Sequence, residues 1–287
     1  MFGKNGKVSN KQVPELPEVH TISSDLDTAI SGYSIAKAWL SDRYPKVTPE
    51  KSLVKDLEGQ KITGVSRTAK NILVELANHS TLLIHLGMTG SILLLDPSRK
   101  TGKHAHLVLK LQKGDSIKVL AFSDPRMFGK LEILEPGQQK ELVKRYGISA
   151  TEALNYLDSL YELTKKRKTT IKSLLLDQKF IAGLGNIYAT EALFLAKIHP
   201  QRKVNTLSKE ELGTLLRRAG EVLADGIKHR GSTLPDEAYV DIWGNAGSHQ
   251  NFLKIYLKSA CPNCKEKVSY IKIAGRGAYF CPVCQPL

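Results

Sequence analysis

Residues 261–284 read CPNCKEKVSYIKIAGRGAYFCPVC and contain every cysteine of this 287-residue chain. Sixteen residues separate two Cys-x-x-Cys pairs, which are formed by Cys261 and Cys264 and by Cys281 and Cys284. Two such pairs are typical of tetrahedral zinc, because each tight turn supplies two thiolates. The residues between them form two strand-like runs around an Ala-Gly-Arg-Gly turn. The stretch therefore predicts a β-hairpin zinc finger that holds one structural Zn²⁺ and leaves no open coordination site.

The charge of the chain indicates the kind of partner it binds. Its formal net charge is +14 and its pI is about 9.5. This basic excess favours a polyanionic partner, most simply nucleic acid, over a merely solubilising surface. No apolar run approaches the roughly 18 residues that a membrane helix needs, and residues 1–12 lack the apolar centre of a secretory signal. We therefore expect a cytoplasmic protein with no membrane segment.

Apolar periodicity divides the rest of the chain into a β-rich part and a helical part. A helix is expected to start at Pro14 and to end near residue 32, because four apolar residues share one face: Val19, Ile22, Leu26 and Ile30. Residues 33–134 contain short strand-like runs broken by turn residues, which is typical of a sandwich or barrel. Residues 138–230 have helical periodicity, and Ser208 with Glu211 forms a capping box.

The motif VPELPEV at residues 13–19 is compatible with covalent chemistry. A terminal Pro14 would carry a secondary amine that titrates near 8 and is partly unprotonated at neutral pH. Such an amine can attack C1′ of a damaged nucleoside and form an iminium, which promotes β-elimination of the 3′ phosphate. Glu15 would protonate the sugar oxygen or shuttle protons. Taken alone, the motif favours the simpler interpretation of a rigid helix start.

The stretch AGLGNIY at residues 182–188 lies between two helical segments. Its backbone amides at a helix start suit phosphate, and Asn186 adds a side-chain donor. A dinucleotide fingerprint is a weak interpretation, because the third glycine and a βαβ unit are missing. A plain helix–helix turn is the remaining alternative.

The loop SDPRMFG at residues 123–129 places Arg126 and Phe128 two residues apart. Side chains of this kind enter a duplex where a base has left the stack. Taken alone, the loop is more simply a turn with a core phenylalanine.

These motifs, in this order, closely resemble the formamidopyrimidine-DNA glycosylases. The resemblance runs from Pro14 to Cys284 and rests on PELPEV, RTAKNIL, IHLGMTG, DPRMFG, GLGNIYATE, IHP and the four-cysteine finger. The related endonuclease VIII type typically begins PEGPE, so Leu16 favours the purine-lesion branch.

The resemblance implies a role for each matching residue. Pro14 would be the nucleophile, Glu15 its proton partner, and Lys70 would reach the damaged nucleotide and its phosphate. Met88, Arg126 and Phe128 would fill the space left by the flipped base, and Arg126 would also pair with the orphaned cytosine. Asn186 and Arg276 would bind phosphates. His85, His104 and His106 are expected to be structural.

The resemblance also implies an α+β multidomain fold. We expect a disordered extension at residues 1–13, a catalytic N-terminal β-sandwich domain with flanking helices at 14–137, and a linker at 138–165. A helix-two-turn-helix domain would follow at 166–250, and the zinc finger at 251–287. The expected partner is double-stranded DNA with oxidised bases or abasic sites, bound by a monomer.

The first residues conflict with the implied chemistry, because Pro14 has an amide nitrogen as long as Val13 precedes it. We expect translation to start at position 13, where a GUG codon would be read as methionine and then removed, or proteolysis after Val13. The expected function is a bifunctional glycosylase and abasic-site lyase for oxidised purines. Three alternatives stay open: a glycosylase for oxidised pyrimidines, a non-catalytic zinc-dependent binder of damaged DNA, and Lys70 as a substitute amine. The segment at 231–259, which would close over the flipped base, matches the family only loosely and leaves the lesion preference open.

Overall fold

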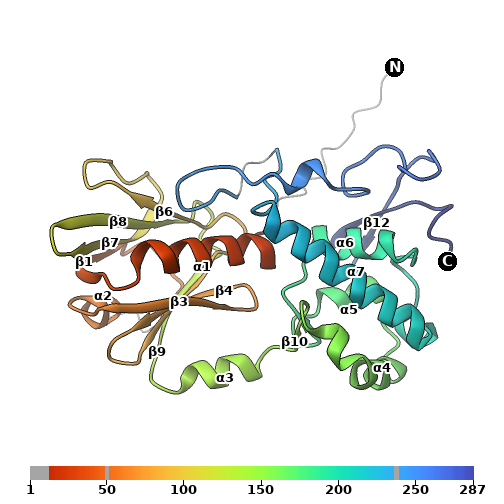
Figure 1. Ribbon diagram of the computed structural model, residues 1–287, viewed down its shortest axis with the longest axis horizontal. Coiled ribbons are helices and arrows are strands. Elements are labelled where there is room, and N and C mark those ends of the chain that lie inside the picture. Colours follow the sequence, from red (N-terminus) through yellow and green to blue (C-terminus); the bar gives the residue numbers. More distant parts are fainter. Residues whose placement is uncertain (1–12, 49–51, 236–238) are drawn as a thin grey trace.

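The computed structural model describes residues 13–48, 52–235 and 239–287 (Figure 1). The extension expected to be disordered therefore lies outside the described residues, except for Val13. Along the described chain, two sheets are followed by a helical region and then by a two-stranded hairpin. In the part of the chain that the structure covers, no helix is both long and apolar enough to span a bilayer.

The N-terminal part is a sandwich of two sheets. One sheet has the order β1-β7-β8-β6, with bounds Ser34–Leu40, Ala105–Lys113, Ser116–Ser123 and Ser91–Leu95. The other has the order β2-β9-β5-β4-β3, with bounds Val47–Thr48, Lys130–Leu134, Thr81–His85, Asn71–Leu76 and Ile62–Thr68. Only the β2–β9 pair is parallel among these strand pairs. One hydrophobic core takes residues from both sheets and from the short helix α2 (Leu53–Leu57), so the predicted sandwich is confirmed.

Helix α1 (Leu16–Ile30) joins the two halves of the molecule. It begins at Leu16 rather than at Pro14, because Glu15 serves as N-cap in a capping box with Glu18 and Pro17 lies in the first turn. The predicted apolar face of α1 packs into the core of the sandwich. Leu16 belongs instead to the core of the helical region. The first residues of α1 are therefore held by a different core from the rest of the helix.

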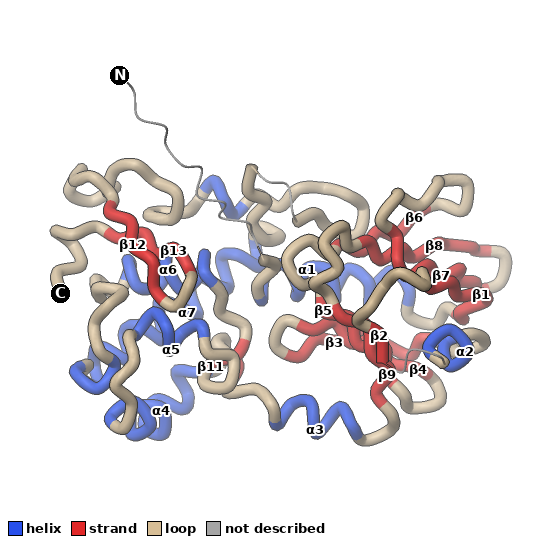
Figure 2. The backbone as a smooth tube through the Cα atoms, turned by 180° about the vertical axis from the view of Figure 1, so that it is seen from behind, coloured by secondary structure: helices blue, strands red, loops and turns tan. Residues whose placement is uncertain are grey.

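The helical region follows the second sheet (Figure 2). Its elements are α3 (Gln138–Lys144), η1 (Ala153–Tyr156), α4 (Leu157–Lys165), α5 (Ile171–Leu176), α6 (Asn186–Leu195), η2 (Val204–Thr206), α7 (Lys209–Lys228) and η3 (His249–Asn251). The predicted capping box of Ser208 and Glu211 starts α7. A short parallel pair, β10 (Ile148–Ser149) with β11 (Ile181–Ala182), was not expected from the sequence. The helix-rich organisation of this region agrees with the prediction.

The C-terminal hairpin is formed by β12 (Ser269–Ile273) and β13 (Arg276–Phe280), as the cysteine spacing predicts. Cys261 and Cys281 are fully buried and form a small core with Phe194 of α6 and with Ile255. The finger is thus fixed to the helix that starts at the AGLGNIY turn.

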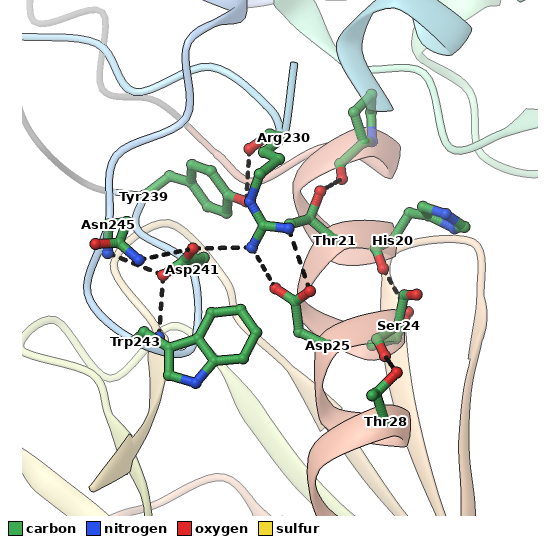
Figure 3. Close-up of polar contacts among 12 residues, drawn as sticks. His20, Thr21, Ser24, Asp25, Thr28, Arg230, Tyr239, Asp241, Trp243 and Asn245 are labelled. Atoms are coloured by element: carbon green, nitrogen blue, oxygen red, sulfur yellow. Dashed lines mark hydrogen bonds and ion pairs between the residues drawn. The ribbon is translucent and has the colours of Figure 1, made fainter. Parts of the chain in front are cut away.

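The segment after α7 returns to the N-terminal half (Figure 3). Tyr239 and Ile242 are buried in the core of the sandwich, and the amide of Leu94 on β6 donates to the Ile242 carbonyl over 2.7 Å. Arg230 donates to Asp25 of α1 over 2.5 Å and to Asp241 over 2.8 Å. The helical region and the sandwich are therefore connected by ion pairs as well as by α1.

Candidate active site

A cavity lies where the two halves and the finger meet. Its volume is about 710 Å³, and its wall comes from segments that are far apart in the sequence. These segments include Val13 and Glu15, the turn at Lys70, His85 and Met88, the AGLGNIY turn, and the hairpin turn at 274–277. Five predicted site residues thus line one cavity: Glu15, Lys70, Met88, Asn186 and Arg276. Pro14, which lies between Val13 and Glu15 in the sequence, is buried.

Glu15 is held at this cavity by the start of α6. Its carboxylate accepts hydrogen bonds from the amides of Ile187, over 2.8 Å, and Tyr188, over 3.3 Å. Burial raises the pKa of Glu15, and the charge of Lys70 and these two amides oppose the rise. A carboxyl whose pKa is raised can hold a proton closer to neutral pH, as a general acid must.

The glycines of the AGLGNIY turn make room for the start of α1. A Cβ on Gly185 would lie 2.3 Å from Glu15 Cδ. Gly183 has a φ of 103°, and a Cβ there would lie 2.4 Å from Leu16 Cδ1. The expectation that this turn offers its helix-start amides to phosphate needs correction, because Glu15 already binds two of them. Asn186 still lines the cavity, and its buried Oδ1 has no hydrogen-bond partner among the described residues.

Lys70 reaches the cavity from the tight turn between β3 and β4. Ala69, just before it, has a left-handed φ of 53°. Burial lowers the pKa of Lys70, the carboxylates of Glu15 and Glu18 oppose this, and the charge of Arg276 adds to the lowering. The cavity therefore brings a lysine and a carboxylate together beside Pro14, although the three residues come from two separate segments.

The predicted wedge residues lie on two loops that pack together. Gly87 has a φ of 62°, and a Cβ there would lie 2.5 Å from the backbone of Phe128. Asp124 is fully buried and accepts from Thr89, Tyr44 and the Gly129 amide, which fixes the loop. This contact places Met88 near Phe128.

Phe128 is not the core residue of the simpler interpretation, because 44% of its surface is exposed. The Arg126 guanidinium lies 4.5 Å from the centre of its ring. Arg126 and Phe128 do not line the cavity with the other site residues. They lie instead on the neighbouring loop, where an exposed aromatic ring is available to another molecule.

The four cysteines fit a tetrahedral metal ion. Their sulfur atoms all lie within 4.8 Å of one another, with Sγ–Sγ distances of 3.8 Å for Cys261 and Cys284 and 3.4 Å for Cys264 and Cys281. Tetrahedral zinc with Zn–S bonds of about 2.3 Å requires edges of roughly 3.8 Å between thiolates. The four cysteines therefore hold one structural Zn²⁺, and they leave no coordination position open for water.

Comparison with known families identifies the chain. Three family models match it: "Formamidopyrimidine-DNA glycosylase N-terminal domain" over residues 13–131, "Formamidopyrimidine-DNA glycosylase H2TH domain" over 148–237, and "Zinc finger found in FPG and IleRS" over 258–287. The chain belongs to the formamidopyrimidine-DNA glycosylase family. The predicted family, fold class, enzyme class and structural zinc are thereby confirmed.

Two curated members of the formamidopyrimidine-DNA glycosylase family show how far the similarity extends. The protein of Desulforamulus reducens is 39% identical over 95% of this chain and 99% of its own length. That of Pelotomaculum thermopropionicum is 37% identical, with the same coverage of both chains.

Solved structures give the same result. The Lactococcus lactis Fpg in complex with DNA containing an abasic site is 34% identical, covers 96% of this chain and 100% of its own, and has a TM-score of 0.87. A structure of MutM with DNA containing carbocyclic 8-oxo-G has the same identity and a TM-score of 0.86.

Two residues of this glycosylase's cavity were given no functional role from the sequence: Tyr256 was not singled out, and His85 was expected to be structural. His85 lines the cavity, and burial lowers its pKa. Tyr256 also lines it, and its amide donates to the buried carboxylate of Glu191 on α6. A histidine on an apolar strand and a tyrosine in a long loop carry no spacing signal, so only the tertiary structure shows that they line the cavity.

Lys172 on α5 is a further residue whose surroundings could not be predicted from the sequence. It is fully buried, and its Nζ donates to the Asn186 carbonyl over 3.0 Å and to Thr190 Oγ1 over 2.5 Å. Burial lowers the pKa of Lys172 to about 7, against the charges of Glu15 and Glu191. Its sequence context is an ordinary short helix, in which a lysine is normally assigned to the solvent face.

Proposed function

We propose that this chain is a bifunctional DNA glycosylase and abasic-site lyase of base-excision repair. Its substrates would be double-stranded DNA with oxidised purines, such as 8-oxoguanine and formamidopyrimidines, and abasic sites. The solved relatives hold DNA with an abasic site, with Fapy-dG or with carbocyclic 8-oxo-G, which supports this substrate class. The single observation that carries the proposal is the carboxylate of Glu15, fixed by two amides next to Pro14 at a cavity that also contains Lys70.

The proposed chemistry starts with the nitrogen of Pro14. Its lone pair forms a bond to C1′ of the damaged nucleotide, the C1′–N bond breaks with its electron pair leaving on the base, and the proton of the attacking nitrogen passes to the departing base. Glu15 then gives a proton to the ring oxygen O4′ as the C1′–O4′ bond opens, which yields an iminium between Pro14 and C1′. Loss of a C2′ proton expels the 3′ phosphate, and a second elimination expels the 5′ phosphate. Hydrolysis of the remaining iminium returns the amine.

A free amine at Pro14 is a requirement of this chemistry. With Val13 attached, the nitrogen of Pro14 is an amide and has no available lone pair. Val13 itself lines the cavity, so it also takes up space beside the proposed nucleophile. We therefore propose that the active form begins at Pro14.

The remaining predicted residues would bind the DNA around this centre. Met88, Arg126 and Phe128 would occupy the gap that the extruded base leaves, because extrusion exposes two base-pair faces that an apolar wedge can cover. Asn186 and Arg276 would bind the flanking phosphates. The net charge of +14 supplies the general attraction to the phosphate backbone.

Borohydride trapping on a duplex with 8-oxoguanine opposite cytosine tests the function. We expect covalent capture by the form that begins at Pro14 and none by the form that keeps residues 1–13. Glu15→Gln in the shorter form should abolish base release, whereas Glu141→Gln, on an exposed surface, should leave it unchanged. Equal capture by both forms, with the longer one verified by mass, would move the nucleophile to a lysine.

A second candidate follows from the same observation on Val13. If residues 1–13 stay attached in the native protein, the chain would be a zinc-dependent binder of damaged DNA without catalysis. That candidate predicts tight binding to an abasic-site duplex with no strand cleavage by the native protein. Faster release of 5-hydroxyuracil than of 8-oxoguanine would instead place the substrate among oxidised pyrimidines.

A further inference from the structure

A continuous chain of polar groups leads from the start of α1 to the surface of α7. At its inner end, Glu18 accepts from the Glu15 amide over 2.8 Å, from the Tyr188 hydroxyl over 2.7 Å and from the Ser232 amide over 2.7 Å. The Tyr188 hydroxyl lies 3.5 Å from Ser232 Oγ, which in turn lies 3.1 Å from Nδ1 of His249. Nε2 of His249 is 3.4 Å from the Asp225 carboxylate.

Only the outer end of this chain meets solvent. Glu18, Tyr188 and Ser232 are fully buried, and His249 is 3% exposed. The side chain of Asp225 is 44% exposed. The His249 ring also stacks on the Tyr188 ring, with centroids 5.3 Å apart. A proton or a charge that changes at His249 is therefore close to Glu18 and shielded from screening by water.

Both ends of the chain are surrounded by groups that set their charge. Glu18 faces Glu15 on its own helix, Lys70 on the β3–β4 turn, Tyr188 on α6 and Tyr239. Burial raises the pKa of Glu18 to about 7, and repulsion from Glu15 adds to the rise.

At the outer end, His249 faces Asp225 on α7 and His229, the C-cap residue of that helix. Burial lowers its pKa, and the negative charge of Asp225 acts in the opposite direction. The chemistry proposed above assigns no part to His249 or to Asp225.

We propose that His249 and Asp225 are positioning residues for the excision reaction, which act through Ser232 and Tyr188 on the charge of Glu18. Ionised Glu18 accepts the Glu15 N–H and so fixes the peptide bond between Pro14 and Glu15, which adjoins the Cα that bears the Pro14 nitrogen. Protonated Glu18 has one acceptor position fewer for three donors, which loosens this peptide. A protonated His249, paired with Asp225, favours the ionised state of Glu18. The inference rests on the proposed function, because it assigns Pro14 as the reacting group.

The first test is the pH profile of single-turnover cleavage, measured on an abasic-site duplex with the form that cleaves in the trapping experiment. His249→Phe keeps a ring against Tyr188 and removes both nitrogens. Since the ionised form of Glu18 then loses support, the midpoint of the acidic limb should rise by roughly half a pH unit or more. Tyr188→Phe should shift it in the same direction, because it removes a donor to that carboxylate.

The double variant decides whether these effects share one route. If His249 acts through Tyr188, the combined shift should be smaller than the sum of the two single shifts. The matched control is His104→Phe, at an exposed position away from this chain, and its profile should match that of the unsubstituted protein. A folded His249→Phe protein with an unchanged profile, or strictly additive shifts, would overturn the inference.

The second test does not depend on activity. Titration of the His249 ring by NMR in the full chain should give a lower pKa in Glu18→Gln than in the unsubstituted protein, because a nearby negative charge is removed. An equal pKa in both proteins would overturn the inference. A lowered pKa, together with no DNA cleavage by the form that begins at Pro14, would refute the proposed function and leave the coupling of His249 to Glu18 in place.

Discussion

The backbone of Gly185 packs so closely against the side chain of Glu15 that no side chain fits at position 185. A Cβ on Gly185 would lie within 2.6 Å of three atoms of the Glu15 side chain. The same carboxylate accepts the amide of Ile187, two residues after Gly185. The glycine therefore determines where the proposed proton donor lies, although it takes no part in the chemistry itself.

Gly185→Ala should displace the Glu15 carboxylate and reduce base excision strongly. We expect the free energy of unfolding to fall by about 1–3 kcal/mol, because a buried side chain must move to admit the methyl group. Urea unfolding and single-turnover excision measure the two effects. Gly220→Ala is the matched control, since nothing lies within 4 Å of a Cβ there in the middle of α7. It should stabilise the protein by roughly 0.5–1 kcal/mol and leave activity intact.

Lys172 should make stability depend on pH above neutrality. Its pKa of about 7 in the folded protein lies below the ordinary 10.5, so the folded state binds fewer protons between these values. Stability then rises with pH in this window, by up to about 1.4 kcal/mol per pH unit. Lys172→Met lacks this contribution, so the stability gap between the two proteins should change steadily from pH 7 to 10 in urea unfolding. The exposed Lys168→Met should run parallel to the unsubstituted protein at every pH; a parallel Lys172→Met would refute the prediction.

Removal of the zinc should weaken DNA binding and unfold the finger, while the β-sandwich stays folded. Cys281→Ser is expected to lose the single equivalent of metal and to unfold the finger, whose buried cysteines pack on Phe194. The hairpin turn with Arg276 would then leave the cavity wall. Affinity for an abasic-site duplex should fall about tenfold or more as phosphate contacts disappear. Val283→Ser, at a residue that is 59% exposed, should keep both metal and affinity.

Phe128→Ala should separate function from stability. Its ring is 44% exposed, so the loss in unfolding free energy should stay below about 1 kcal/mol. Excision should slow by about tenfold, because unstacking a base costs a few kcal/mol that the wedge no longer offsets. Trp39→Ala removes a ring of similar exposure, 53%, from β1 and should leave the rate unchanged. Equal rates for Phe128→Ala and the unsubstituted protein would remove Phe128 from the wedge.

Asp241→Asn should loosen the contact between the segment after α7 and α1. Burial alone would raise the pKa of Asp241, but the Asn245 amide and the Arg230 guanidinium outweigh it and lower the pKa below its ordinary 3.8. The carboxylate thus contributes stability above pH 4, which is lost as the pH falls further. We expect a loss of roughly 1–3 kcal/mol at pH 7 that shrinks below pH 4. The exposed Asp115→Asn should show neither effect in the same unfolding series.

The sequence by itself determined the main elements and the chemistry of single motifs, but not the β10–β11 pair or the first residue of α1. The cysteine spacing was sufficient for the finger, because four thiolates in two tight turns have few other uses. The short strand-like runs between turn residues in 33–134 predicted a sandwich or barrel, and Ser208 with Glu211 predicted the start of α7. These features are local, so neighbouring residues are enough to specify them.

The tertiary structure alone decided which distant groups share a site. The helix-start amides after Gly185 looked suited to phosphate in the sequence, and they bind Glu15 instead. The sequence could not predict that Lys172 and His249 are buried, because the segments that cover them are distant along the chain. Their lowered pKa values follow from this burial and could not be predicted either. A local sequence pattern indicates which chemistry a residue is capable of, whereas tertiary packing determines its contacts and its protonation state.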